Sequence, residues 1–299
     1  MSSSPKTSVI IPTYERADQL KQTLGYLSLC KPAPAETLVH IDFGDNSTED
    51  MLKSEFPEVV VLQSLERQGA GGGRNKLYHA ATHECLVSLD DDSWPLDQTF
   101  FQQAHELVES NPKVAVFGCD IQESDGKIKE FPPPTSQPDQ EETLKPASNF
   151  VGCAAILRRS ALMQTHGYVR TRLFHGLEET DMTLQLIDLG WEIRSAYHLQ
   201  VFHACDRISH HATPSINAGE IRNVALLAWL RYPIWFFPYA FLQLMNRLVF
   251  SVRHRRFRGI LSGLCSILPA CWSYRRLRSP VSVKAVRKFR ALRKQEAAE

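Results

Sequence analysis

The sequence has no apolar run that is long enough to cross a lipid bilayer without interruption. A spanning helix needs about 20 apolar residues. The most apolar stretch, residues 223–250, is broken by Arg231 and by two prolines, and residues 259–272 form a shorter one. The amino terminus has neither the basic start nor the apolar segment of a secretion signal. We therefore expect no ordinary membrane-spanning helix and no secretion, and we place the protein in the cytoplasm.

Paired cysteines and the known phosphate-binding loops are also absent. The seven cysteines include no Cys-x-x-Cys pair, which favours reduced and mostly buried thiols. No Lys-Ser or Lys-Thr follows the glycines at 71–73, and the first apolar run lacks the glycine fingerprint of dinucleotide-binding folds. Two interpretations of these glycines stay open. They form either a loop before a helix, whose backbone N–H groups approach an anion, or a plain flexible turn.

Acidic residues are scarce in the last quarter of the chain. From Arg222 to Glu299 there are 16 Lys and Arg residues against 2 Asp and Glu, whereas residues 1–221 hold 18 against 31. An acidic body of charge −13 is thus followed by a tail of charge +14, although the formal net charge is only +1. This division predicts cation-dependent chemistry in the body and an anionic surface as partner of the tail. We expect that surface to be a membrane, and we expect no nucleic acid as partner.

Short apolar runs alternate with helical patterns over the first 120 residues. This β-α-β-α order predicts an α/β fold with a mostly parallel sheet flanked by helices. The expected strands are 7–12, 37–42, 58–63, 85–90 and 113–118, and the expected helices are 16–28, 47–54, 73–82 and 97–110. Because ligands of such sheets bind outside the carboxyl ends of the strands, polar residues at those ends are the first candidates for a site.

The chain is expected to have three parts. Residues 1–120 form one half of the main domain, and residues 121–221 form the other, with a proline-rich acidic loop or lid at 130–146. Residues 222–299 form a tail of basic amphipathic helices, which we expect to lie in the interface of an anionic membrane. The alternative is that these helices pack on the surface of the body with a solvated basic face.

Three consecutive carboxylates, Asp90 to Asp92, directly follow the apolar run 85–89. Their mutual repulsion becomes tolerable if a divalent cation lies among them, and hard oxygen ligands favour Mg²⁺ or Mn²⁺. In a turn at the end of a strand the first and third side chains can converge, so Asp90 and Asp92 are the expected metal ligands, while Asp91 points elsewhere. A solvated acidic turn or a helix N-cap is the alternative.

The order of the strand-end motifs resembles that of family 2 glycosyltransferases, which have the GT-A fold. The motifs are SVIIPTYERADQL, VHIDFGDNSTED, GAGGGRNKLYHA and LVSLDDDS. The resemblance implies a nucleotide-sugar site in the first half of the chain. Its implied residues are Pro12, Thr13 and Glu15 around the nucleobase, Asp42 on the base, Arg74, Asp90 and Asp91 on the nucleotide sugar, and Asp90 with Asp92 on the metal.

The sequence departs from the family pattern at two places. Glu15 stands where the family has Asn, and the segment after Ile41 is about two residues longer than in the family pattern. Asp42 and Asp45 therefore both remain candidates for the contact with the base, and the identity of the nucleotide stays open.

Residues 176–182, GLEETDM, resemble the family's Glu-Asp-x-Asp-Leu motif. The resemblance makes Glu179 the expected catalytic base, with Glu178 before it and Asp181 after it. Neighbouring residues on a helix point about 100° apart, so only one of the two glutamates can serve well. The alternative is that these acids complement the N-terminus of a helix.

Other residues are expected around the acceptor and the metal. Trp94, His175 and Glu178 are the acceptor-binding candidates, since an indole ring can stack on a sugar face. His203 ends the apolar run 199–203 and is the candidate nitrogen ligand of the metal, which suits Mn²⁺ better than Mg²⁺. Packing in the core is the alternative for both Trp94 and His203.

The resemblance implies an inverting, metal-dependent transfer of a sugar from a nucleoside-diphosphate donor to a hydroxyl of a glycan or a lipid-linked acceptor. We expect this reaction at the inner face of the plasma membrane, in the synthesis of a surface polysaccharide. A sugar-phosphate nucleotidyltransferase is one alternative, although the residues after the first strand, PTYERADQL, do not form its usual phosphate loop. A non-catalytic protein that binds glycans or membranes is the other.

Overall fold

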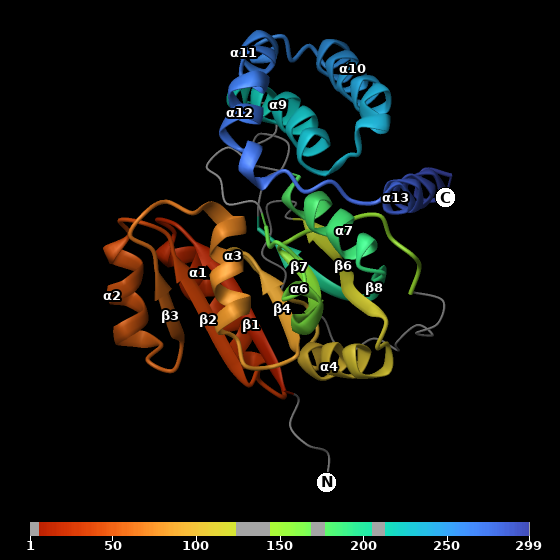
Figure 1. Ribbon diagram of the computed structural model, residues 1–299. Helices are drawn as coiled ribbons and strands as arrows, with labels where there is room; N and C mark the ends of the chain where they lie inside the picture. Colours follow the sequence, from red (N-terminus) through yellow and green to blue (C-terminus); the bar gives the residue numbers. More distant parts are fainter. Residues whose placement is uncertain (1–5, 124–143, 169–176, 205–212, 299) are drawn as a thin grey trace.

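A computed structural model of the 299-residue chain describes residues 6–123, 144–168, 177–204 and 213–298. A mixed sheet of eight strands lies at its centre, with helices on both faces (Figure 1). The strand order is β3-β2-β1-β4-β7-β6-β8-β5. The strands are β1 (Thr7–Thr13), β2 (Glu36–Ile41), β3 (Val60–Gln63), β4 (Cys85–Leu89), β5 (Ser93–Pro95), β6 (Val114–Glu123), β7 (Ala154–Arg158) and β8 (Glu192–His203).

The helices fall into a set around the sheet and a set in the tail (Figure 1). Around the sheet are α1 (Ala17–Leu29), α2 (Asn46–Glu55), α3 (Gly69–Ala80), α4 (Phe100–Ser110), α6 (Arg159–Leu162) and α7 (Glu178–Asp188). The tail contains α9 (Pro214–Arg231), η1 (Ile234–Phe236), α10 (Phe237–Arg253), α11 (Ile260–Cys265), α12 (Ile267–Ser273), η2 (Arg275–Leu277) and α13 (Val283–Glu296).

The expected α/β fold is confirmed, and the mixture of strand directions follows from the position of β7. The pairs β1–β2, β1–β4, β2–β3 and β6–β8 are parallel. β7 lies between β4 and β6 and runs antiparallel to both, and β5 runs antiparallel to β8. Because β1, β2 and β4 are mutually parallel, their carboxyl ends meet at one edge of the sheet, which is where the site is expected.

Side chains of alternating residues in each central strand point to opposite faces and form two cores. Val9 and Ile11 of β1 belong to the core under α1, α2 and α4. Ile10 belongs to the core under α3, α6 and α7. Each strand buried on both faces therefore appears in the sequence as a continuous apolar run instead of an alternating pattern.

The glycines at 71–73 are not a loop, and both sequence-based interpretations of them were wrong. α3 begins at Gly69, so all three glycines lie inside its first two turns, and all three are buried. A Cβ atom on Gly73 would lie 2.7 Å from Nδ1 of His40 and 3.1 Å from Cβ of Pro12. Gly73 is therefore needed because α3 packs closely against β1 and β2.

Part of the tail packs on the body. Buried apolar residues of α9 and α13, including Leu226 and Phe289, form one core with Leu184 and Ile187 of α7. Arg231, at the end of α9, contacts Asp181 of α7 through Nε–Oδ1 at 2.5 Å and Nη2–Oδ2 at 3.1 Å. The charge that interrupts the apolar run of the tail is thus paired inside the protein.

The remaining tail helices are more exposed. Twelve of the twenty exposed large apolar side chains among the described residues lie between Ile234 and Leu277, over η1, α10, α11, α12 and η2. Within the described ranges, no helix combines the length and the apolarity required to cross a bilayer. Most of the expected acidic loop at 130–146 lies outside the described residues; of it, only residues 144–146 are described, and Pro146 forms a bridge with Arg194 of β8.

Candidate active site

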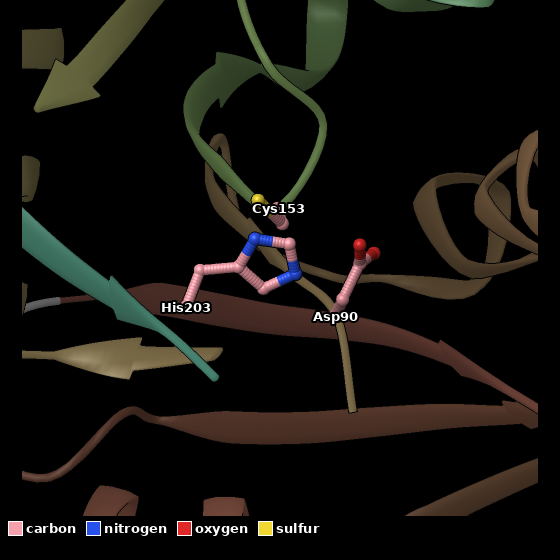
Figure 2. Close-up of side chains that lie close together, drawn as sticks. All are labelled: Asp90, Cys153 and His203. Atoms are coloured by element: carbon pink, nitrogen blue, oxygen red, sulfur yellow. The ribbon is translucent and has the colours of Figure 1, made fainter. Parts of the chain in front are cut away.

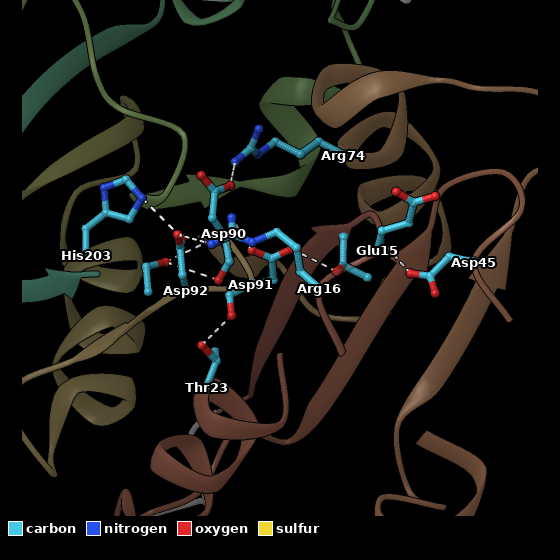
Figure 3. A network of polar contacts seen from close by, with 11 residues as sticks. Glu15, Arg16, Thr23, Asp45, Arg74, Asp90, Asp91, Asp92 and His203 are labelled. Carbon is cyan, nitrogen blue, oxygen red and sulfur yellow. Dashed lines mark hydrogen bonds and ion pairs between the residues drawn. The ribbon is translucent and has the colours of Figure 1, made fainter. Parts of the chain in front are cut away.

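The three aspartates form a tight turn between β4 and β5. The backbone N–H of Asp90 donates to Oγ of Ser93 at 2.8 Å, and the N–H of Ser93 donates to the carbonyl oxygen of Asp90 at 3.2 Å. Asp90 contacts Arg74, whereas Asp91 and Asp92 share Arg16 (Figure 3).

Asp91, the middle residue, contacts the last residue of β1, Thr13, and Arg16, which follows that strand. Its carboxylate accepts a hydrogen bond from Oγ1 of Thr13 at 2.8 Å and forms an ion pair with Arg16 at 2.9 Å. Burial raises the pKa of Asp91 to about 7, because the loss of water outweighs the attraction of Arg16 and the hydrogen bond from Thr13. Asp91 is 4% exposed.

Asp92 lies between Arg16 and His203. Nη2 of Arg16 is 2.7 Å from Oδ2, and Nε2 of His203 is 3.2 Å from Oδ1. Burial favours the neutral acid, but His203 and Arg16 together outweigh it and lower the pKa of Asp92. β8 supplies His203 at its last position, where it pairs with Ser93 across the antiparallel β5–β8 ladder.

Asp90 is bound by Arg74 of α3. The Nη2 atom of Arg74 contacts Oδ1 of Asp90, and its Nε donates to Oγ of Ser88 at 3.0 Å. The side chain of Arg74 is 3% exposed and that of Asp90 is 34% exposed. The buried guanidinium therefore orients Asp90 while part of the carboxylate still faces solvent.

Glu179 lies on the other side of Arg74. It is the second residue of α7, and its Oε1 accepts a hydrogen bond from the backbone N–H of Gly152 at 3.1 Å. A Cβ atom on Gly152 would lie 2.8 Å from Oε1 of Glu179 and 2.9 Å from Cζ of Arg74. Gly152 is thus the point at which the carboxylate expected to act as base and the arginine that holds Asp90 come together.

The surroundings of Glu179 favour its protonated form. Burial is the largest cause, the neighbouring charge of Glu178 adds to it, and Arg74 opposes both, so that the pKa of Glu179 is raised to about 8. A carboxylate with a raised pKa is a stronger base than one in water, which suits a residue that must accept a proton near neutral pH.

One carboxylate, one histidine and one cysteine form a set that fits a divalent cation. Ligand atoms of Asp90, Cys153 and His203 all lie within 4.8 Å of one another (Figure 2). The Oδ1 atom of Asp92 is buried and lies 3.2 Å from Nε2 of His203. Oxygen and imidazole donors suit Mn²⁺ or Mg²⁺, while the sulfur of Cys153 favours a softer ion.

The residues expected around the nucleobase are largely engaged within the protein. Asp42 accepts hydrogen bonds from the N–H groups of Gln68 and Gly69, at 2.8 and 3.0 Å, and so caps α3. Asp45 is the N-cap of α2 and also accepts from the N–H of Glu15 at 2.7 Å. Pro12 is buried against α3, whereas Glu15 is exposed and has a φ of 54°. Their contacts with a nucleotide stay predictions.

Trp94 does not have the position expected of it. Its ring stacks on Tyr26, with centroids 4.4 Å apart, and also contacts Phe202, and the residue is 1% exposed. The predicted stacking on an acceptor sugar was therefore wrong, because the residue lies in a small core between α1 and β8. The second acceptor candidate, His175, lies outside the described residues. The third, Glu178, is buried at the start of α7 and accepts a hydrogen bond from the N–H of Leu177 at 3.0 Å.

Sequence reasoning missed two residues of this site. Arg16 follows the strand-end residues PTYE and occupies the place of the Arg in the family's Pro-Thr-Tyr-Asn-Arg run, so a signal for it was present. Cys153 gave no signal, since it is separated from Asp90 by about sixty residues and approaches it only because β7 pairs with β4.

Comparison with known families agrees with this geometry. Residues 8–165, more than half of the chain, match the family model described as "Glycosyl transferase family 2". The chain belongs to this family. A search of the curated proteins finds no match.

Solved structures support the same fold for this family 2 glycosyltransferase. S. aureus TarS 1-349 in complex with UDP-GlcNAc has a TM-score of 0.61 at 15% identity, over 96% of this chain and 83% of the other. Mannosyltransferase PcManGT from Pyrobaculum calidifontis, in complex with GDP-Man and Mn²⁺, has a TM-score of 0.57 at 15% identity, over 99% and 81%. GalNAc-T7 with UDP, GalNAc and Mn²⁺ has a TM-score of 0.58 at 13% identity, over 79% of this chain.

The likeness to these structures establishes the GT-A fold. The chain covers 49% of the GalNAc-T7 chain, about half of its length. At 13–15% identity these structures show the fold and not the donor, the metal or the acceptor of this protein.

Proposed function

We propose that this protein is a glycosyltransferase that uses a divalent cation and transfers a sugar, with inversion, from a nucleoside-diphosphate donor to a hydroxyl group of a glycan or a lipid-linked acceptor. The observation that carries the proposal is the position of Arg74. It holds Asp90 on one side and lies against Gly152, which binds Glu179, on the other. A carboxylate suited to bind a metal and a carboxylate suited to act as base are thereby kept in one place.

Asp90, Asp92 and His203, with Cys153 close by, would hold the cation. When bound, it supplies positive charge that stabilises the departing diphosphate. Solved structures of GalNAc-T7 and PcManGT contain Mn²⁺, together with UDP or GDP-Man, which supports a cation of this kind here.

Glu179 acts as general base in the proposed reaction. It removes the proton from the acceptor hydroxyl while the oxygen of that hydroxyl forms a bond to the anomeric carbon. The bond from this carbon to the donor phosphate breaks at the same time, and the nucleoside diphosphate leaves with the electron pair. Attack from the face opposite the leaving group inverts the anomeric carbon, so no covalent sugar–enzyme intermediate is required.

The decisive experiment separates binding from transfer. Wild-type protein is screened by thermal shift with UDP, GDP and other nucleoside diphosphates, with and without Mn²⁺, because a ligand of the native state raises the melting temperature. Glu179→Gln should keep the metal-dependent shift and lose about 10²- to 10⁴-fold in transfer rate, the usual contribution of a general base. If no nucleoside diphosphate binds in the presence of Mn²⁺, the proposal is wrong.

The exposed part of the tail is proposed to bind the cytoplasmic face of an anionic membrane. Trp235, Leu261, Leu268 and Trp272 are 65% or more exposed, and Arg275 lies over the ring of Trp272 at 4.2 Å. Apolar side chains beside arginines suit the boundary between acyl chains and anionic headgroups. Co-sedimentation with phosphatidylglycerol vesicles should exceed that with phosphatidylcholine vesicles, and Trp235→Ser with Trp272→Ser should weaken it. Equal binding to both lipids would exclude an electrostatic role.

A further inference from the structure

A large cavity lies between the body and the tail, beside the start of α7. Its volume is about 730 Å³, within the usual range for small-ligand sites of about 300–1,000 Å³. Leu177 and Thr180 line it from the turn of α7 that carries Glu179. Most of the other lining residues come from α9, α10 and α13; in Figure 1, α9 and α10 lie above α7 and α13 lies beside it.

The cavity has an apolar wall and a cationic side. Leu227, Tyr232, Leu242 and Phe289 contribute apolar surface. Arg290 and Arg293 of α13 line it as well, and they also line an adjoining cavity of about 430 Å³ together with Arg287 and Lys294. These four cations are exposed, and none of them forms an ion pair with an acidic side chain in the described parts of the chain.

The arginines are positioned to bind an anion. The guanidinium of Arg290 lies over the ring of Tyr239 at 4.1 Å, and that of Arg293 lies over Phe289 at 5.8 Å. Stacking on a ring face leaves the N–H groups of the guanidinium plane available to phosphate oxygens.

The cavity exists because the end of the chain returns to the body. Glu296 of α13 accepts hydrogen bonds from the N–H of Ser148 at 2.6 Å and from the Oγ of the same serine. Ser148 and the neighbouring Asn149 also line the cavity, and the side chains of Thr180 and Asn149 are in hydrogen-bond contact at 3.3 Å. The cavity therefore reaches the start of α7, the helix that carries Glu178 and Glu179, through Leu177 and Thr180.

We propose that this cavity binds the acceptor and that the acceptor is a sugar linked to a lipid through a phosphate or diphosphate. The apolar wall would take the first part of the lipid chain, Arg290 and Arg293 would bind the phosphate, and the acceptor hydroxyl, which the sugar carries, would face the start of α7. This inference rests on the proposed sugar transfer and names the acceptor class. It also explains why the cations of α13 gather on the cavity side, where a purely solvated basic face would have no reason to place them.

The binding test uses the full-length protein with three soluble probes. These are farnesyl diphosphate, inorganic pyrophosphate, and farnesol. Calorimetry should find farnesyl diphosphate bound at least about tenfold more tightly than either of the other two, because only it uses both the cations and the apolar wall. Equal affinity for pyrophosphate and farnesyl diphosphate would overturn the proposal, since the apolar wall would then contribute nothing.

Two variants with equal loss of charge locate the site. Arg290→Gln with Arg293→Gln should weaken the binding of farnesyl diphosphate by about tenfold or more. Lys284→Gln with Lys288→Gln removes the same charge from the same helix, on residues that do not line either cavity, and should change the affinity less than about twofold. Equal effects of the two double variants would mean that the probe senses only the general charge of the tail.

Two further measurements distinguish the remaining outcomes. Val224→Trp should fill the cavity and exclude the probe, with a melting curve to verify that the variant is folded.

Vesicles of phosphatidylglycerol separate an acceptor site from headgroup binding: if the arginine variant loses vesicle binding but keeps farnesyl diphosphate, the proposal is wrong. Donor binding with Mn²⁺ is measured on the same samples. Normal donor binding with no lipid-phosphate binding rejects this inference alone, whereas loss of donor binding in the wild type rejects the sugar transfer itself.

Discussion

Arg231 and Asp181 form a buried ion pair that joins the tail to the body. Arg231 is 2% exposed and Asp181 is fully buried, and Asp181 also accepts a hydrogen bond from Gln185 at 2.9 Å. The third acid of the GLEETDM segment is therefore a structural residue, and it anchors α9 next to the start of α7, where Glu179 lies.

Replacing Arg231 with alanine should destabilise the protein strongly, because Asp181 would remain buried without its partner. The expected loss is about 3–5 kcal/mol of the free energy of unfolding, measured by urea denaturation. Lys284→Ala, on an exposed residue, should change it by less than about 0.5 kcal/mol. Arg231→Met together with Asp181→Leu should recover most of the loss. A loss below about 1 kcal/mol for Arg231→Ala would show that water reaches the pair.

Gly73 of α3 offers a test of the close packing of this helix against the sheet. Gly73→Ala should lower the free energy of unfolding by about 1–3 kcal/mol, since the added methyl group meets the fully buried His40 at 2.7 Å. Gly25→Ala is the matched control in α1, where a Cβ atom has nothing within 4 Å. It should stabilise by about 0.5–1 kcal/mol, the ordinary advantage of alanine in a helix. Stabilisation by both changes would contradict the close approach of α3 to the sheet.

The raised pKa of Glu179 predicts that stability and activity change in opposite directions with pH. The native state keeps the proton of Glu179 up to about pH 8, whereas the unfolded chain releases it near its ordinary pKa of 4.5. The contribution of Glu179 to the free energy of unfolding is complete below pH 4.5 and decreases as the pH rises from 4.5 to about 8. The transfer rate should rise over the same range, because the base must be deprotonated.

Urea denaturation at several pH values measures this effect. In Glu179→Gln the free energy of unfolding should decline less steeply between pH 4.5 and 8 than in the wild type. Asp91, whose pKa is also raised, stays in both proteins, so that the difference between them isolates Glu179. Identical slopes would place Glu179 in water.

The thiol beside Asp90 and His203 predicts a spectroscopic signature of the metal site. Co²⁺ in the wild type should give an absorption band from sulfur-to-metal charge transfer, because Cys153 is the thiol that lies beside Asp90 and His203 among the described residues. Cys153→Ser should lose the band, while Cys30→Ser, on a buried cysteine at the end of α1, should keep it. His203→Ala should weaken Co²⁺ binding. If the band survives in Cys153→Ser, the thiol of Cys153 is not its source and is not shown to be a ligand.

Much of the sheet and one edge of the site follow from local sequence patterns. The apolar runs that become β1, β2 and β4 are buried on both faces, and such runs can be recognised from the residues alone. Parallel topology then brings their carboxyl ends together, which is why Asp90 and Asp92 could be placed at the sheet edge before the structure was known. The start of α7 at Glu178 is also marked locally, by three acids in its first turn.

The sequence by itself determined which residues follow each strand, because a buried strand can be recognised from an apolar run of a few residues. Tertiary structure decided what those residues touch. Gly71 to Gly73 lie inside a helix, Trp94 is buried, and Cys153 approaches His203. Each of these outcomes depends on contacts between segments tens of residues apart, whose energies no local pattern records. The same holds for Arg231, whose charge looked like an interruption of the tail until α9 packed on α7 and paired it with Asp181.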